Sequence, residues 1–117
     1  MGSYSSRISW ETLRYLDTST SPYSTGVYTA IGGPLIYPSY ICKLVNNSNQ
    51  LVTISINGAT DIDVAPANSF WLYDEGKYVP GSSPIPALPA GTQIYVKGPG
   101  SSGTGLIYLV TQYIIQL

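Results

Sequence analysis

Two short acidic clusters are the residues in this chain whose spacing could support chemistry: Asp61-x-Asp63 and Asp74-Glu75. Paired carboxylates can hold Ca²⁺, and in glycosidases they divide the roles of acid and base. Residues two apart on a strand point to the same side, so alternation alone places Asp61 and Asp63 together on the solvent face of a predicted hairpin. The pattern favours surface carboxylates over an ion site, and no metal is predicted.

The segment 98–103 (GPGSSG) matches the G-x-G-x-x-G pattern of dinucleotide-binding loops. In those loops a helix follows the glycines, and its N-terminus receives the pyrophosphate. Here the run LIYLV (106–110) follows, which is typical of a strand. We therefore predict that 98–103 is a hairpin loop.

The sequence has no histidine, the residue that usually acts as the base in nucleophilic catalysis. The chain has no His and a single cysteine, Cys42, and no G-x-S-x-G elbow surrounds a serine. A Ser–Lys pair would need Lys43, Lys77 or Lys97 beside a hydroxyl group, and no motif places one there. We expect a protein that is not an enzyme and that uses no cofactor.

Charge is scarce along the whole chain. Only 9% of the 117 residues are charged, and the formal net charge is -1, whereas an average soluble domain is about 25% charged. A nucleic-acid-binding module needs a basic face, and a membrane-spanning helix needs about 20 apolar residues in a row, so neither class is expected. The chain has 11 Tyr, 2 Trp and 1 Phe. Because interface cores lose charge and gain Tyr and Trp, the composition favours a protein that hides much of its surface in an assembly.

Strand patterns dominate the elements that must position these residues. The 12 Gly and 9 Pro leave little room for a long helix. Runs rich in β-formers and bounded by turn residues predict strands at 27–31, 40–45, 51–56, 60–65, 69–73, 92–97 and 106–115. Segment 7–17 fits either a strand or a single helical turn.

Seven or eight short strands predict an all-β chain that folds as a single antiparallel β-sandwich, of the jelly-roll type. Residues 1–25 are expected to form an N-terminal arm or first strand, and residues 26–117 the sandwich domain. Between the strands, 46–49 (NNSN) predicts a polar turn and the proline-rich segment 79–91 predicts an extended loop outside the sheets. Strand 106–115 is apolar on both faces, so it is covered twice: within the sandwich, or once by the core and once by a partner.

The Asn-Gly pair after strand 51–56 sets the register of the next hairpin. A two-residue loop would place apolar side chains opposite aspartates. A three-residue loop pairs Ile54 with Thr60 and Val52 with Ile62, and it gives Gly58 the left-handed position of a bulge turn. Because a slip of one residue moves every side chain to the other face, we predict the three-residue loop.

A second class of function rests on the aromatic residues. Tyrosine rings near loops can stack on sugar rings, as they do in carbohydrate- or receptor-binding β-sandwich modules. The tyrosines placed for this are Tyr73, Tyr78, Tyr95 and Tyr108. Packing or subunit contact explains the same residues, and the sequence favours that explanation.

About two-thirds of the chain carries a resemblance to a known class of proteins. The stretches are LVNNS (44–48), VTISING (52–58), DIDVAP (61–66), FWLYD (70–74), LPAGTQIYVKG (88–98) and GTGLIY (103–108). Together they resemble small β-sandwich structural proteins of tailed bacteriophage virions, of the capsid decoration (cement), head-fibre or head–tail accessory kind.

The resemblance implies a non-enzymatic role in the virion. Such a protein self-associates as a homo-oligomer and docks on a major capsid or connector protein, with no nucleic acid and no membrane as partner. The residues expected to make the subunit or particle contacts are Tyr4, Trp10, Tyr15, Tyr78, Val79, Tyr108 and Tyr113.

Overall fold

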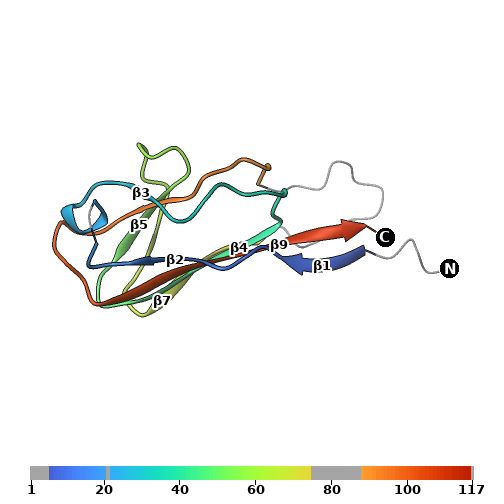
Figure 1. Ribbon diagram of the computed structural model, residues 1–117. Helices are drawn as coiled ribbons and strands as arrows, with labels where there is room; N and C mark the ends of the chain where they lie inside the picture. The colour runs from blue at the N-terminus through green and yellow to red at the C-terminus, as the bar shows by residue number, and fades with distance from the viewer. Residues whose placement is uncertain (1–5, 21, 75–87, 117) are drawn as a thin grey trace.

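The computed structural model describes residues 6–20, 22–74 and 88–116, and it consists of two antiparallel sheets that pack face to face (Figure 1). The first sheet has β1 (Ser6–Trp10) and β2 (Arg14–Asp17) end to end along one edge of β9 (Gly105–Gln116), followed on its other edge by β4 (Ile41–Ser48) and β7 (Ser69–Asp74). The second sheet has the order β3 (Thr29–Ala30), β8 (Tyr95–Lys97), β5 (Val52–Ser55) and β6 (Asp63–Ala65). The predicted all-β sandwich is confirmed.

The described residues form nine strands, more than the seven or eight predicted, because segment 7–17 contains two of them. β1 pairs with the end of β9 and β2 pairs with its beginning. Between them Glu11 turns its carboxylate away from the ladder, to accept hydrogen bonds from the backbone N–H groups of Ile36 and Tyr37. The strand interpretation of this segment therefore holds, with a break at Glu11. Strand 27–31 is shorter than predicted and is reduced to β3.

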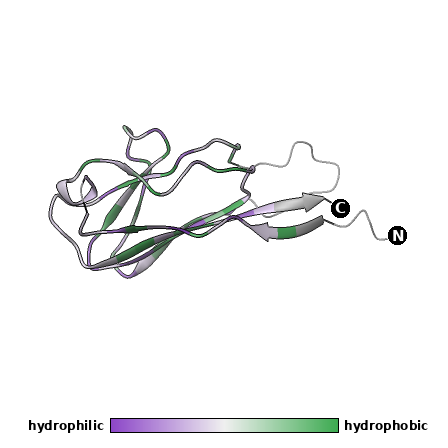
Figure 2. Cartoon of the chain, in the orientation of Figure 1, coloured by the Kyte–Doolittle hydropathy of each residue, from purple (hydrophilic) through white to green (hydrophobic). Residues whose placement is uncertain are grey.

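Alternation along the strands builds the core. The buried cluster consists of Tyr23, Ile31, Cys42, Leu44, Val52, Ile54, Ala65, Ile94, Val96, Ile107 and Leu109. Each fully buried aliphatic side chain contributes roughly 1.5–3 kcal/mol relative to an exposed one. Figure 2 shows apolar colour along both sheets and also on β1, which extends away from this core.

The predicted turn at 46–49 is wrong, because β4 continues through Ser48. Asn46 is 1% exposed, and its side-chain amide donates to the backbone carbonyls of Gln50, Ala65 and Pro66 at 2.7–3.0 Å. A buried polar side chain needs hydrogen-bond partners within the protein. The Asn46 amide finds them in three carbonyls outside β4, whereas a turn residue would bind water. The chain therefore reverses later, beyond Ser48.

The predicted three-residue loop of the β5–β6 hairpin is also wrong. Ile54 pairs with Asp63 and Val52 pairs with Ala65, so the connection is longer than predicted. The side-chain oxygen of Asn57 accepts hydrogen bonds from the backbone N–H groups two and three residues on, both at 2.8 Å, and this stabilises the wider loop. Gly58 does adopt the predicted left-handed conformation, with φ of 74°.

The glycine-rich segment 98–103 is a crossover between the two sheets, and the predicted hairpin is wrong. It connects β8 of the second sheet to β9 of the first. A Cβ atom on Gly103 would lie 2.7 Å from the side chain of Gln50 and 2.8 Å from Thr18 Oγ1. Glycine is therefore required because the chain passes this closely over the end of the core.

The end of β9 and strand β1 leave the sandwich as a two-stranded ribbon (Figure 1). Pairing of β9 with β4 stops at Gln112, which lies opposite Ile41, whereas pairing with β1 continues to the end of the strand. At the base of the ribbon the rings of Tyr37 and Tyr113 stack, with centroids 4.0 Å apart and planes 15° apart. Isolated two-stranded ribbons are marginally stable, so this stack helps to anchor it to the sandwich.

Candidate interaction surfaces

The outer face of the first sheet carries a row of apolar and aromatic side chains. Tyr15 of β2 lies opposite Tyr108 of β9, which lies opposite Val45 of β4, which in turn lies opposite Phe70 of β7. Tyr15 is 65% exposed and Phe70 57%. Cross-strand neighbours stand on one side of a sheet, so the row forms one continuous strip across four strands.

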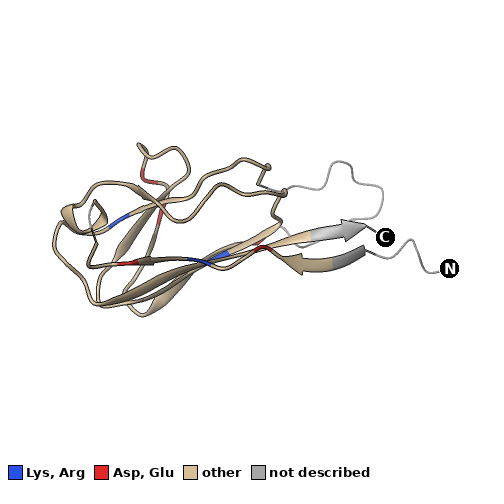
Figure 3. Ribbon diagram, viewed as in Figure 1, with Lys and Arg blue, Asp and Glu red and all other residues tan. Residues whose placement is uncertain are grey.

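This outer face has few charges. By register and alternation, Asp17, Lys43 and Asp74 are the charged residues that stand on this side of the described strands. Figure 3 shows how few charged residues the described strands carry. The register also places Ile41 and Trp10 on this side, since both lie opposite Gln112. No described layer of the chain covers the face, because the second sheet packs on the other side.

A hollow of about 530 Å³ lies along the β2 edge of this sheet. Its apolar lining includes Leu13, Tyr15, Pro34 and Ile36, and we call it the edge hollow. Leu13 is 49% exposed and Ile36 69%. Exposed apolar side chains gathered around one concave site typically mark an interaction surface.

A largely buried ion pair forms part of the lining of the edge hollow. Arg14 Nη2 donates to Glu11 Oε1 at 2.8 Å, and the two side chains are 9% and 2% exposed. The guanidinium also donates to the carbonyls of Gly33 and Pro34, both at 2.9 Å, and to Thr111 Oγ1 at 3.2 Å. These bonds satisfy both charges within the chain, so the surface above them is left neutral.

Two features of this ion pair follow from its surroundings. Burial acts to raise the pKa of Glu11, but the hydrogen bonds from Arg14 and from the backbone of Tyr37 and Ile36 outweigh it and hold that pKa below its usual value. Gly32 has φ of 68°, and a Cβ atom there would lie 2.6 Å from the Arg14 side chain. Glycine at position 32 therefore leaves the room through which Arg14 passes.

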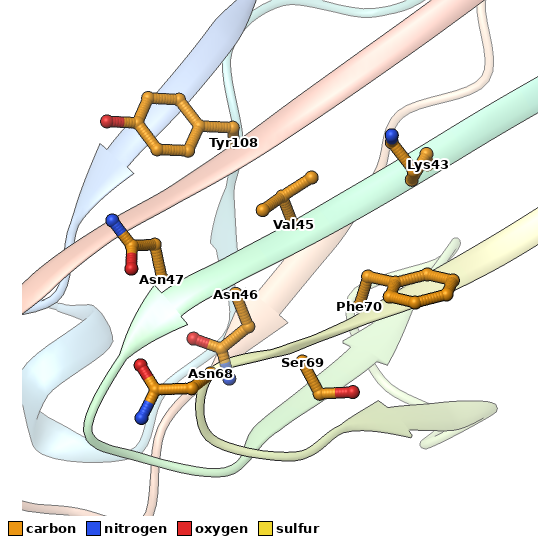
Figure 4. Close-up of a pocket in the computed structure, with 8 residues that line it drawn as sticks. All are labelled: Lys43, Val45, Asn46, Asn47, Asn68, Ser69, Phe70 and Tyr108. Atoms are coloured by element: carbon orange, nitrogen blue, oxygen red, sulfur yellow. The ribbon is translucent and has the colours of Figure 1, made fainter.

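A second hollow, of about 550 Å³, lies on the outer face itself, and we call it the face hollow. Figure 4 shows Val45 between the rings of Phe70 and Tyr108, with Asn47 on the Tyr108 side. The other lining residues are Lys43, Asn46, Asn68 and Ser69. Apolar walls with a few convergent polar groups are the usual composition of a small-molecule site.

The outer face of the second sheet is more polar. Lys97 Nζ lies 3.1 Å from Asp61 Oδ1 and 4.6 Å from the centre of the Tyr28 ring, and the Tyr28 hydroxyl donates to the same carboxylate. Desolvation and the Asp61 carboxylate raise the pKa of Tyr28 to about 12. The hydrogen bonds from Tyr28 and Lys97 lower the pKa of Asp61.

Of the four predicted contact residues that the structure describes, three lie on one face and the fourth lies elsewhere. Trp10, Tyr15 and Tyr108 share the outer face of the first sheet. Tyr113 stands on the opposite side of β9, against Tyr37. The remaining three, Tyr4, Tyr78 and Val79, lie outside the described residues.

The three described tyrosines among those predicted to stack on sugars are dispersed. Tyr108 lines the face hollow, but Tyr73 packs against the core, and Tyr95 belongs to the second sheet. Tyr78 lies outside the described residues. The sequence interpretation missed Phe70, although its alternation with the inward-facing Trp71 and Tyr73 was a signal that it faces outward.

Three of the residues considered for chemistry, Asp61, Asp63 and Cys42, are engaged in structural contacts or buried. Asp61 binds Lys97, and Asp63 Oδ2 accepts a hydrogen bond from Trp71 Nε1 at 2.8 Å. Burial raises the pKa of the Cys42 thiol to about 12, so the thiolate that a nucleophile needs is disfavoured. Within the described ranges, no group of three or more His, Cys, Asp and Glu residues could hold a metal ion.

Comparisons with known proteins give no family for this chain. No protein-family model matches it, and no curated protein matches its sequence significantly. Among the described residues there is no helix long and apolar enough to cross a membrane.

Proposed function

We propose that this protein is a non-enzymatic structural component that self-associates through the exposed apolar surface of its first sheet and decorates or stabilises a bacteriophage capsid or connector. The observation that carries the proposal is the row Tyr15–Tyr108–Val45–Phe70 on an uncovered face with few charges. An apolar strip of this kind is stabilised when a partner removes it from water.

The strand order supports the jelly-roll interpretation that belongs to this proposal. Without β1, the two sheets have the orders β2-β9-β4-β7 and β3-β8-β5-β6. Successive strands alternate between the sheets, and only β5 and β6 follow one another within one sheet. Eight strands in two sheets that the chain visits alternately fit a jelly roll, an architecture used for viral capsid and lectin domains.

A second copy of this chain is the occupant that the edge hollow fits best. The hollow is mostly apolar, and the Glu11 and Arg14 charges in its lining are already paired within the chain. A neutral surface can contact its own copy without repulsion between like charges, and closed symmetric oligomers use such self-complementary surfaces. The expected contacts include Trp10, Tyr15 and Tyr108 as well as Leu13 and Ile36.

The particle role is tested by locating the protein in material from its natural source. Clarified lysate is separated on a density gradient, and the protein is followed by immunoblotting. Co-sedimentation with capsid-sized particles is expected, with release of the protein as a discrete oligomer when the particles are dissociated. Recovery of the protein only in the slowly sedimenting fractions would contradict a structural role on a particle.

A further inference from the structure

We propose that the open edge of β1 pairs with the same edge of a second copy, so that two copies form one continuous antiparallel sheet across a two-fold axis. This inference rests on the self-association proposed above, but it assigns a further contact, at a strand edge instead of a sheet face. β1 pairs with β9 on one side, and no described strand pairs with it on the other. Such an edge presents backbone N–H and C=O groups, which another strand satisfies in a regular ladder.

The phase of the hydrogen bonds shows which residues of β1 point to the open edge. The N–H of Glu11 donates to the carbonyl of Thr111 at 3.2 Å, directly after the last residue pair of the β1–β9 ladder. Along an antiparallel strand, residues that bond one neighbour alternate with residues whose N–H and C=O face the other way. Ser9 therefore bonds β9, whereas Ile8 and Trp10 direct both backbone groups to the open edge.

The β9 side of the ladder has the same phase. Gln112 lies opposite Trp10, and its carbonyl accepts a hydrogen bond from Ser39 Oγ at 3.0 Å. Ser39 lies on the β4 side of β9, because it shortly precedes Ile41, the β4 residue that is opposite Gln112. The Gln112 carbonyl is thus directed away from β1, as the alternation requires.

The open edge is self-complementary. When a two-fold axis passes between the Ile8 residues of two copies, each Ile8 lies opposite the other, and Ser6 of each copy lies opposite Trp10 of the other. These residues all direct N–H and C=O to the shared edge, so each pair can form both of its hydrogen bonds. Arg7, the one charged residue in the sequence of β1, then lies opposite Ser9 of the second copy. Like charges therefore do not meet across the contact.

The shape of the molecule admits this pairing and gains from it. The ribbon of β1 and β9 extends away from the sandwich (Figure 1), so two antiparallel ribbons place their sandwiches at opposite ends. A ribbon of two strands is marginally stable alone, whereas three or more strands support one another. Pairing converts the two ribbons into one sheet with the order β9-β1-β1-β9.

The other edges compared with β1 are poorer templates. The edge strands of the second sheet, β3 and β6, have two and three residues, whereas β1 has five. Very short edge strands, proline and lysine are common ways to keep a sheet edge from pairing. The sequence of β1 contains neither proline nor lysine, so its edge lacks this protection.

Spin labels test the pairing directly. Ile8→Cys places a nitroxide at the proposed axis, where paired Cβ atoms lie about 5 Å apart, and Cys42 does not compete for the label because it is fully buried. We expect strong dipolar broadening of the EPR spectrum. Val64→Cys is the matched control, since Val64 is similarly exposed but stands on the second sheet, and its label should show no broadening.

A proline substitution tests the hydrogen-bond phase. Ile8→Pro removes an N–H that faces the open edge and leaves the bonds to β9 in place, a position where strands tolerate proline. It should raise the dissociation constant of the oligomer about tenfold or more, because each copy loses a hydrogen bond. Ile8→Thr keeps the N–H and the branched side chain, and should leave the native mass unchanged. Circular dichroism checks that Ile8→Pro is folded, and the spin labels decide if it is not.

Three results would overturn the edge pairing. One is an oligomer whose position-8 labels show no broadening, which would leave the apolar surface of the first sheet as the interface and the proposed function intact. Another is a folded Ile8→Pro variant that assembles as tightly as Ile8→Thr. The third is loss of the broadening when Leu13→Asp is added to the labelled chain, which would make the edge dependent on the edge hollow. A monomer at every concentration would contradict the proposed function as well.

Discussion

The two outer faces of the sandwich are built from strands of the same kind but meet their surroundings differently. On the first sheet, one cross-strand row consists of Tyr15, Tyr108, Val45 and Phe70. On the second sheet the corresponding row, Val64–Thr53–Lys97, mixes an apolar, a hydroxyl and a charged side chain.

Folding alone requires only that the inner faces be apolar. The outer face of the second sheet mixes polar and apolar side chains, as expected of a sheet face in contact with water. The outer row of the first sheet is more apolar than folding requires, and such an excess is what we expect of a surface that another molecule covers. Folding therefore explains the apolar inner faces of both sheets. It does not explain the apolar outer row of the first sheet, for which we propose contact with a partner.

The largest expected effect is a loss of stability, and it should differ between the Glu11–Arg14 and Asp61–Lys97 ion pairs. Arg14→Ala leaves the Glu11 carboxylate, 2% exposed, without its counter-charge, and should lower the free energy of unfolding by about 3–5 kcal/mol. Lys97→Ala breaks the ion pair of the second sheet, whose side chains are 30% and 59% exposed, and should lower the free energy of unfolding far less, because solvent screens exposed ion pairs. Urea unfolding followed by circular dichroism at one fixed protein concentration measures both, and equal losses would contradict the distinction.

The next largest effect is expected on self-association, when a charge is placed either in the edge hollow or on the second sheet. Leu13→Asp introduces a charge into its apolar lining, and should raise the dissociation constant of the oligomer about a hundredfold, or about 2.7 kcal/mol. Val64→Asp places the same charge on the outer face of the second sheet, where Val64 is 45% exposed, and should leave the native mass unchanged. Sedimentation velocity of the two variants decides, and dissociation of Val64→Asp would implicate the second sheet instead.

A smaller effect is expected on the pH dependence of the free energy of unfolding. The pKa of Glu11 is lowered in the folded state, so the unfolded chain binds its proton first as the pH falls. The stability that Glu11 contributes is present above its usual pKa of about 4.5 and is lost as the pH falls through the lowered value. Glu11→Gln should reduce the pH dependence in this range by at most one proton, about 1.4 kcal/mol per pH unit.

Urea titrations at several acidic pH values measure this slope. Asp61→Asn is the matched comparison, because the pKa of Asp61 is also lowered but its carboxylate is exposed. A slope that is unchanged in Glu11→Gln would show that this carboxylate does not contribute to acid sensitivity.

The smallest expected effect is at the core. Cys42 is fully buried, and its thiol pKa is raised to about 12, so the folded protein should react negligibly with Ellman's reagent at pH 8. The same chain in concentrated urea should release one equivalent of the chromophore, because it has 1 Cys. Rapid labelling without denaturant would mean that the sandwich opens at β4.

The positions of most strands were predictable because side chains alternate with a period of two. Strands 69–73 and 106–115 were predicted within a few residues, and the predicted strand 92–97 places Ile94 and Val96 in the core. The features that could not be predicted from the sequence depend on contacts between residues far apart in the chain. The end of β4 depends on Asn46 bonding carbonyls up to 20 residues away, and the role of 98–103 depends on which sheet each neighbouring strand joins.

The candidate surface was partly predictable for the same reason. Trp10, Tyr15 and Tyr108 were chosen as aromatic residues in a chain with little charge, and register brings them to one face. Leu13 and Ile36 were missed, because they lie outside regular strands and come together only through the contacts of Arg14 with the loop that precedes β4. Local patterns thus identified the exposed aromatic residues but not the hollow beside them.

We propose above all that a second copy of this chain covers the exposed surface of the first sheet. The most direct test is the native mass of the purified protein by analytical ultracentrifugation, at a micromolar concentration and at one tenfold lower. We expect a discrete oligomer whose mass is unchanged by dilution. A monomer of 12.6 kDa at both concentrations would contradict it.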